Sequence, residues 1–118
     1  MEYSREILLD FEIIRSLKEL DDDGSNSFFK EIISLYNEQF PELYRKIANA
    51  VKENKSDDLS KTAHALKGAS LNIGAKELAS VCKTMELNGK ENRMDNMDFL
   101  LESLSAVYSA TMSELNKI

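Results

Sequence analysis

The sequence has few of the residues that interrupt helices or that build metal and redox sites. Its 118 residues include four glycines, one proline, one cysteine and one histidine. So little glycine and proline leaves little material for turns and favours long helices. The lone Cys82 cannot form an internal disulfide, which fits a reducing compartment. A single Cys and a single His cannot form a zinc set, and the paired Glu-x-x-His motifs of a di-iron bundle are missing, so we expect no metal and no cofactor.

Long apolar runs and an excess of basic residues are missing as well. Without a run of about 18 apolar residues or a basic-then-apolar amino terminus, we expect no membrane span and no signal peptide, and we expect a cytoplasmic protein. The formal net charge of −6 argues against nucleic-acid binding, which needs a clustered basic face. The acidic run 19–24 is short and lies between helical patterns, so we interpret it as a solvated loop rather than an interaction tail.

What is present is the composition of one globular domain with a helical period. Apolar residues make up 42% and charged residues 31% of a chain whose length fits a single domain, 1–118. After a lead-in at 6–9, Asp10 can cap a short first helix, and Ser25 or Asn26 can cap a second helix that extends to about residue 51. Pro41 lies inside that second helix. Because the apolar positions keep their phase across it, we expect one kinked helix, with a break at Pro41 as the alternative.

Three more helices complete the predicted fold. The polar segment 53–58 is a turn, in which Ser56 or Asp57 can cap a third helix that Gly74 ends. A fourth helix follows, then a turn at 87–95 around Gly89, and a final helix from about Asp95 to the end. We therefore predict an all-α, antiparallel up-down four-helix bundle, with the short N-terminal helix as a lid on one end.

A helical wheel turns the only histidine away from the core. If Leu66 marks the core direction, Ala63 and Ser70 fall within about 60° of it, whereas His64 falls at about 160°. A buried core histidine is therefore improbable, and an exposed histidine without a role is the alternative. The same outer face carries Lys61, Gly68 and Leu71.

The neighbours of His64 favour a role in group transfer. Gly68, one turn later, costs about 1 kcal/mol relative to Ala inside a helix, and it leaves the ring open to an approaching protein. Lys67 can place an ammonium beside an anionic group on the ring, and Leu71 suits the rim of a docking surface. The combination is typical of a nucleophilic nitrogen that accepts an anionic group. The sequence shows no catalytic triad and no ATP-binding glycine loop, so the group would come from and leave to other proteins.

The string HALKGAS at 64–70, followed by NIGA at 72–75, resembles the signature of histidine-containing phosphotransfer (HPt) domains. These domains are the intermediate carriers of multistep two-component phosphorelays. The resemblance continues in FPELYRKI before the motif, in KELASVCKTME after it, and in a Gly-terminated fourth helix that leads to a long last helix. The length and the starting Met resemble those of a free-standing HPt protein.

The resemblance implies a role for each matching residue. His64 matches the phosphoacceptor, modified on Nε2, Lys67 matches the lysine that balances phosphate charge, and Gly68 matches the glycine that lets a receiver domain approach. Ser70 matches a small residue near the acceptor helix, to which we give a structural role. Glu86, 22 residues after His64, matches a Gln or Glu that faces the ring and can hold Nδ1–H, although an exposed Glu without a role is the alternative.

The resemblance also implies a set of partners. We expect receiver domains and a hybrid sensor histidine kinase to bind a surface that includes Lys61, Leu71 and Lys90, where a plain surface lysine is the alternative for Lys90. We expect Mg²⁺ only in the receiver, no kinase activity in this chain, and a monomer. Two other function classes stay open: an adaptor that carries no phosphate, and the phosphoacceptor module of a chemotaxis-type kinase.

Overall fold

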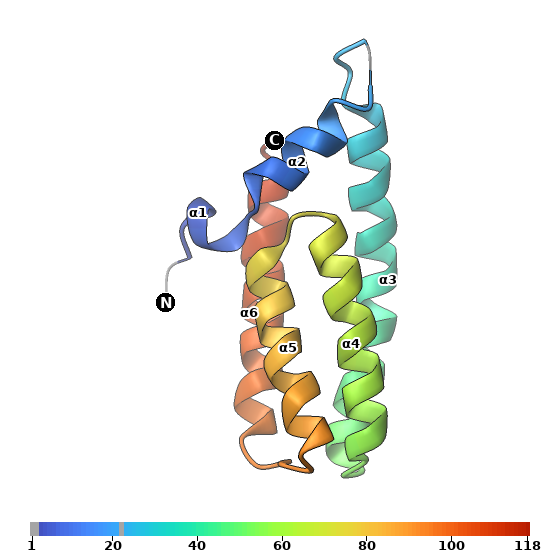
Figure 1. Ribbon diagram of the computed structural model, residues 1–118, viewed down its shortest axis with the longest axis vertical. Coiled ribbons are helices and arrows are strands. Elements are labelled where there is room, and N and C mark those ends of the chain that lie inside the picture. Colours follow the sequence, from blue (N-terminus) through green and yellow to red (C-terminus); the bar gives the residue numbers. More distant parts are fainter. Residues whose placement is uncertain (1–2, 22) are drawn as a thin grey trace.

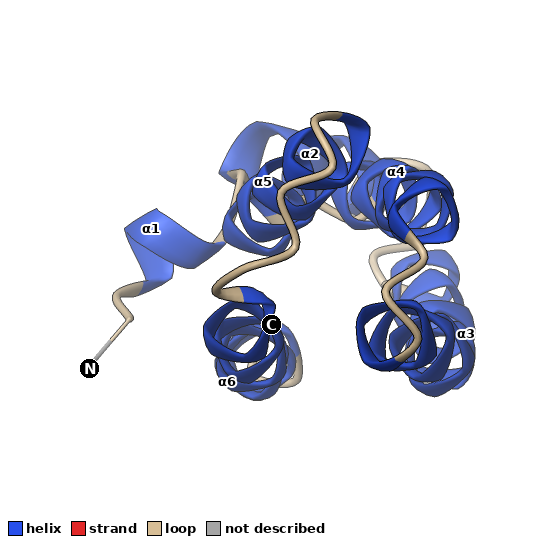
Figure 2. Cartoon of the chain, turned by 90° about the horizontal axis from the view of Figure 1, so that it is seen from below, coloured by secondary structure: helices blue, strands red, loops and turns tan. Residues whose placement is uncertain are grey.

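The chain folds into an antiparallel four-helix bundle with two short helices at its amino end. Figure 1 shows the computed structural model, which describes residues 3–21 and 23–118, and all regular secondary structure in these ranges is helical. The helices are α1 (Arg5–Leu8), α2 (Phe11–Lys18), α3 (Ser27–Lys52), α4 (Ser56–Asn72), α5 (Lys76–Lys90) and α6 (Met97–Leu115). Viewed from the end, the four long helices occupy the corners of a square (Figure 2). The predicted bundle is confirmed.

The amino-terminal prediction of one short helix is wrong by one element. The lead-in at 6–9 lies largely within α1, because the Ser4 hydroxyl accepts a hydrogen bond from the Ile7 amide at 3.3 Å and starts a helical turn. Leu8 and Leu9 are fully buried, and α1 packs against α5 and α6. Asp10 caps α2 as predicted, with its Oδ1 accepting from the Glu12 amide at 3.1 Å.

Helix α2 covers one end of the α4–α5 pair, as the lid prediction states (Figure 1). The Asp10 amide donates to the Gly74 carbonyl at 2.8 Å, which ties the start of α2 to the turn between α4 and α5. Gly74 ends α4 with φ +78°, a left-handed conformation that glycine adopts without strain. A Cβ atom at Gly74 would lie 3.0 Å from the Asp10 carbonyl oxygen, so the lid also needs a glycine there.

The acidic run has a structural role that the sequence analysis does not assign to it. Its residues follow α2, which ends at Lys18, and Asp22 lies outside the described residues. The Asp21 carboxylate accepts a hydrogen bond from the Phe28 amide at 2.7 Å, so it satisfies a free N–H group in the first turn of α3. Asn26, one of the two predicted capping residues, has a left-handed φ of 59° and gives no side-chain cap hydrogen bond in the described part of the chain.

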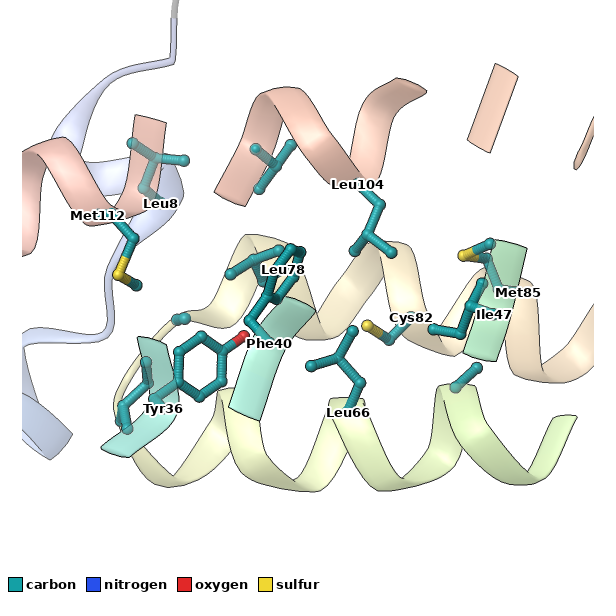
Figure 3. Packing of buried hydrophobic residues seen from close by; sticks show 14 of the residues in the cluster. Leu8, Tyr36, Phe40, Ile47, Leu66, Leu78, Cys82, Met85, Leu104 and Met112 are labelled. Atoms are coloured by element: carbon teal, nitrogen blue, oxygen red, sulfur yellow. The ribbon is translucent and has the colours of Figure 1, made fainter. Parts of the chain in front are cut away.

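Helix α3 continues through Pro41, so the alternative of a break is wrong. Apolar residues on both sides of the proline, such as Phe40 and Ile47, are buried in the same core, and this common packing keeps the two halves in one helix. Figure 3 shows these side chains among others from α1, α3, α4, α5 and α6. Cys82 lies among them, and burial raises the pKa of its thiol to about 12, so the sulfur is neutral at pH 7.

Three long helices end in the same hydrogen-bonded turn. The residue after each helix cap has a left-handed φ: Asn54, Gly74 and Asn92. The following amide then donates back to a carbonyl five residues earlier, as in the 2.8 Å bond from Lys55 to Ala50. This turn is so short that Lys55 is the capping position of α4, and the prediction that Ser56 or Asp57 caps the helix is wrong.

The predicted turn around Gly89 is also wrong. Gly89 is buried inside α5, which continues to Lys90, and the turn forms at Asn92. Helix α6 begins at Met97, close to the predicted start at about Asp95. A Cβ atom at Gly89 would lie 2.8 Å from the Ser56 carbonyl oxygen, closer than real Cβ contacts occur. The glycine therefore serves a close approach of α5 to α4.

Replacing Gly74 tests the packing of the lid. We expect Gly74→Ala to lower the free energy of unfolding by about 2–3 kcal/mol, from left-handed strain plus the clash with α2. Gly24→Ala is the matched control, because Gly24 has a similar φ of +73° but no described atom lies within 4 Å of its Cβ position. Strain alone should cost that variant about 1 kcal/mol. Urea unfolding measures both, and equal losses would contradict the lid contact.

Candidate functional site

Helix α4 presents His64 on its outer face, as the wheel predicts. The His64 side chain is 68% exposed, whereas Ala63 and Leu66 on the opposite face are fully buried. The next residue along the helix, Ala65, is also exposed, and its small side chain leaves the ring uncovered. The only imidazole of the chain is therefore open to a partner molecule.

A buried carboxylate on α5 holds one nitrogen of this ring. His64 Nδ1 lies 2.9 Å from Glu86 Oε2, and the Glu86 side chain is only 6% exposed. The alternative of an exposed Glu86 without contacts is wrong. An ionised carboxylate only accepts hydrogen bonds, so the proton must lie on Nδ1. In the neutral ring, Nε2 then carries the free lone pair and points away from this hydrogen bond.

Two lysines complete the cluster around Glu86. Lys67 Nζ donates to Glu86 Oε1 at 2.7 Å, and Lys90 Nζ lies 3.3 Å from Oε2. The hydrogen bond from Lys67 is the main cause that lowers the pKa of Glu86 from 4.5 to about 2, with Lys90 and His64 adding to it and burial opposing it. Glu86 is therefore a stable anion at neutral pH. Lys90, for which a plain surface lysine was the alternative, belongs to the cluster.

The open side of His64 lies toward Gly68. Gly68 is exposed one turn after His64, and no described atom lies within 4 Å of its Cβ position. Leu71, a further turn along, is half exposed on the same helix. An incoming protein surface can therefore reach the backbone of α4 beside the ring without meeting a side chain at residue 68.

Lys61, which the sequence analysis assigns to the partner surface, lies outside the cluster, as does Gln39 of α3. Lys61 lines a hollow of about 360 Å³ between α3 and α4 that also contains Lys46 and Asn49. Gln39 lines another hollow between the same two helices, of about 400 Å³, next to Ala65. Both hollows lie on the α3 side of α4, whereas Glu86 approaches His64 from α5.

Ser70 faces inward, as predicted, and supports α4 from behind. Its hydroxyl donates to the Leu66 carbonyl at 2.8 Å and lies 2.7 Å from the Tyr36 hydroxyl of α3. Because the single proton of Ser70 goes to Leu66, Tyr36 is the donor in the second bond. Sequence reasoning assigned no role to Tyr36, although a phenol in the middle of an apolar stripe is a signal that it needs a buried partner.

Gly89 was assigned to the wrong kind of structure, and its place in the site was missed with it. It lies between Glu86 and Lys90 in sequence, on the side of α5 that touches α4. The Glu86–Lys90 pair has the i, i+4 spacing that favours an ion pair on a helix, and this spacing is the signal that α5 continues past residue 89.

Within residues 3–21 and 23–118, no group of three or more His, Cys, Asp and Glu side chains could hold a metal ion. None of the described helices has the length and apolar character to cross a membrane.

The chain is similar in sequence to known proteins. The chain is 29% identical over 102 residues to histidine-containing phosphotransfer protein 2 of Arabidopsis thaliana, which covers 84% of this chain and 65% of that protein. It is 25% identical over 109 residues to the phosphorelay intermediate protein YPD1 of Candida albicans, covering 92% of this chain and 58% of that protein. The chain thus spans less than two thirds of the length of these two relatives.

Known structures share the fold. The histidine-containing phosphotransfer protein HptB of Pseudomonas aeruginosa superimposes with a TM-score of 0.83 at 24% identity, over 92% of this chain and 91% of that chain. MtHPt2 of Medicago truncatula gives a TM-score of 0.80 at 23% identity, over 93% and 78% of the two chains. The sequence pattern of the Hpt domain matches residues 31–110, well over half of the chain. With its bundle and its match to this pattern, the chain belongs to the Hpt domain family.

Proposed function

We propose that this chain carries a phosphoryl group on His64 between the aspartates of receiver domains in a multistep phosphorelay. The observation that supports this most is the hydrogen bond of 2.9 Å between Nδ1 of an exposed imidazole and the buried Glu86 carboxylate. That bond leaves Nε2 as the free nucleophile on the surface. The names of the two relatives, a phosphotransfer protein and a phosphorelay intermediate, agree with the proposal.

The proposed step moves one phosphoryl group and no other atoms. Nε2 attacks the phosphorus of a receiver aspartyl phosphate, the bond between phosphorus and the carboxylate oxygen breaks, and the bond between Nε2 and phosphorus forms. The ring keeps its proton on Nδ1, so phosphorylation makes it cationic, and the Glu86 carboxylate balances that charge at 2.9 Å. The reverse step passes the group to the aspartate of the next receiver.

On this proposal, the chain and the receiver provide different parts of the reaction site, and this chain provides a positioned nucleophile. It provides the nucleophile, its tautomer and the Lys67 ammonium, whereas the receiver provides Mg²⁺ and the acidic pocket that holds it. On this proposal the chain is a phosphocarrier with no cofactor and no kinase activity of its own. A single copy contains every group that this chain contributes to the step, so we propose a monomer as the working unit.

The proposed docking surface is the exposed face around His64. Gly68 gives access, and Leu71 and the partly exposed Ile13 of α2 give apolar contact area. Lys61 adds positive charge on the α3 side of α4, and Lys90 adds it on the α5 side. The partners are receiver domains and a hybrid sensor histidine kinase, and the compartment is the cytoplasm. An apolar patch with a charged rim is typical of a transient protein interface.

The first experiment identifies the phosphorylated atom. A phosphorylated receiver should label the wild-type chain with acid-labile phosphate, and ³¹P NMR should show the Nε2 isomer, because Nδ1 is held by Glu86. His64→Gln should fold normally, since the residue is outside the core, and should accept no label. Circular dichroism controls for folding. Acid-labile phosphate on His64→Gln would disprove the proposal, and an unlabelled wild type would favour the adaptor.

A second experiment tests access at Gly68. Gly68→Gln adds a side chain beside the ring, so we expect transfer from a receiver to slow by a factor on the order of 100. Labelling by phosphoramidate, a donor too small to touch residue 68, should stay within about twofold of wild type, which shows that His64 itself is intact. The variant should also be more stable, because Gln is the better helix former. Normal transfer from the receiver would disprove the access role.

The anionic state of Glu86 predicts a dependence of stability on pH. Its pKa in the folded chain is about 2, below the ordinary 4.5, so its contribution to stability is complete above about pH 4.5 and disappears as the pH falls toward 2. Glu86→Gln should therefore be less stable than wild type at pH 6, and the difference should shrink in urea unfolding at pH 3. Glu42→Gln, which removes an exposed pair with Arg45, should change stability little at either pH. A constant difference for Glu86→Gln would contradict its assigned ionisation.

A further inference from the structure

The contact between α4 and α5 is the most extensive between any two helices in the described chain. Where α4 begins and α5 ends, the two backbones approach each other at Gly89. A Cβ atom on this residue would lie 2.8 Å from the Ser56 carbonyl oxygen, 3.0 Å from the Ser60 amide nitrogen and 3.1 Å from the Ser60 Cβ. The first two are backbone atoms of α4, so they cannot turn aside as the end of a long side chain could.

The residues beside Gly89 belong to the ion-pair cluster that holds the imidazole. Glu86 precedes Gly89 by less than one turn of α5, and Lys90 follows it directly. On the facing helix, Ser60 precedes His64 by one turn, so the narrow point lies next to the site on both helices. The Glu86 side chain then covers the remaining distance and makes hydrogen bonds of 2.9 Å to His64 and 2.7 Å to Lys67.

The two glycines of α4 and α5 have different surroundings. Each one costs about 1 kcal/mol of helix stability relative to alanine. At Gly68 no described atom lies within 4 Å of the Cβ position, and this glycine therefore leaves space for a partner. At Gly89 the space is already filled by the backbone of α4. This glycine therefore determines the distance between two helices of the same chain.

We propose that Gly89 is a positioning residue for the reaction at His64: by letting α5 touch the first turn of α4, it sets the distance at which Glu86 holds Nδ1. This inference rests on the proposed function and extends it to a residue that touches neither the ring nor the phosphoryl group. A Cβ at residue 89 needs about 0.6 Å more space to reach an ordinary contact of 3.4 Å with Ser56. A shift of that size at Glu86 would break a hydrogen bond whose geometry decides the tautomer.

The experiment compares Gly89→Ala with Thr84→Ala in the full chain. Thr84 is exposed on the same helix, so its replacement by alanine gives a similar gain in helix propensity without adding an atom between the helices. Two quantities are measured. The first is the position of the ring proton, from ¹⁵N NMR of labelled histidine, which is unambiguous because His64 is the only histidine. The second is the rate of phosphorylation by phosphoramidate, in which Nε2 attacks phosphorus and ammonia leaves.

We expect Gly89→Ala to move part of the neutral ring population from the Nδ1–H form to the Nε2–H form, which is the form that a histidine side chain prefers in water when no neighbour holds Nδ1–H. The phosphorylation rate should fall on the order of tenfold, since small displacements of a reacting group have large effects on rate. Thr84→Ala should match wild type in both measurements. If Gly89→Ala also keeps the wild-type tautomer and rate, the inference is overturned.

Two further outcomes keep the inference separate from the proposed function. If the wild type accepts no phosphoryl group but the tautomer still shifts in Gly89→Ala, the phosphorelay proposal fails and the positioning role stands. If Gly89→Ala does not fold, Ser60→Thr adds one methyl group to the same contact from the α4 side. An unchanged tautomer and rate in a folded Ser60→Thr would then overturn the inference.

Discussion

The buried carboxylate of Glu86 is the constraint around which the site is organised. An ionised group with a side chain only 6% exposed is costly unless it is fully paired, and this one is paired with Lys67, Lys90 and the imidazole. The same three contacts that stabilise the anion also orient the ring and hold both ammonium groups beside it. The contacts that pair the buried anion are therefore the same contacts that position the imidazole. A loss of any one partner would weaken the remaining contacts of Glu86.

Helix α4 is held from both sides, which explains how a nucleophile on an open surface can be well oriented. On the outer side Glu86 holds the ring, and on the inner side Tyr36 and Ser70 tie the helix to α3 through a hydrogen bond of 2.7 Å. The ring thus has a fixed direction while 68% of its side chain is exposed. A rigid group on an accessible face suits transfer between proteins, because the partner can complete the reaction site around it.

The sequence predicted the features that repeat and missed those that depend on a single contact. Helical periodicity predicted that His64 lies on the outer face of its helix and that Ser70 lies on the inner face. The unbroken phase of the apolar positions predicted that α3 continues through Pro41. Periodicity cannot show whether a glycine ends a helix or lets two helices touch, and for this reason Gly89 was assigned to a turn. Its role depends on the Ser56 carbonyl, 33 residues away in the chain, and only the packing of α4 on α5 brings the two together.

The choice of a carboxylate at position 86 poses a question, since an anion beside the ring repels an incoming phosphoryl group. The cluster as a whole answers it. Two unit charges about 4 Å apart interact by about 4 kcal/mol at an effective dielectric constant of about 20, so neither the repulsion from one carboxylate nor the attraction to one ammonium dominates alone. Glu86 brings one negative charge, whereas Lys67 and Lys90 bring two positive ones. The net charge next to His64 is therefore positive before the ring itself is counted, and the carboxylate gathers more positive charge than it cancels.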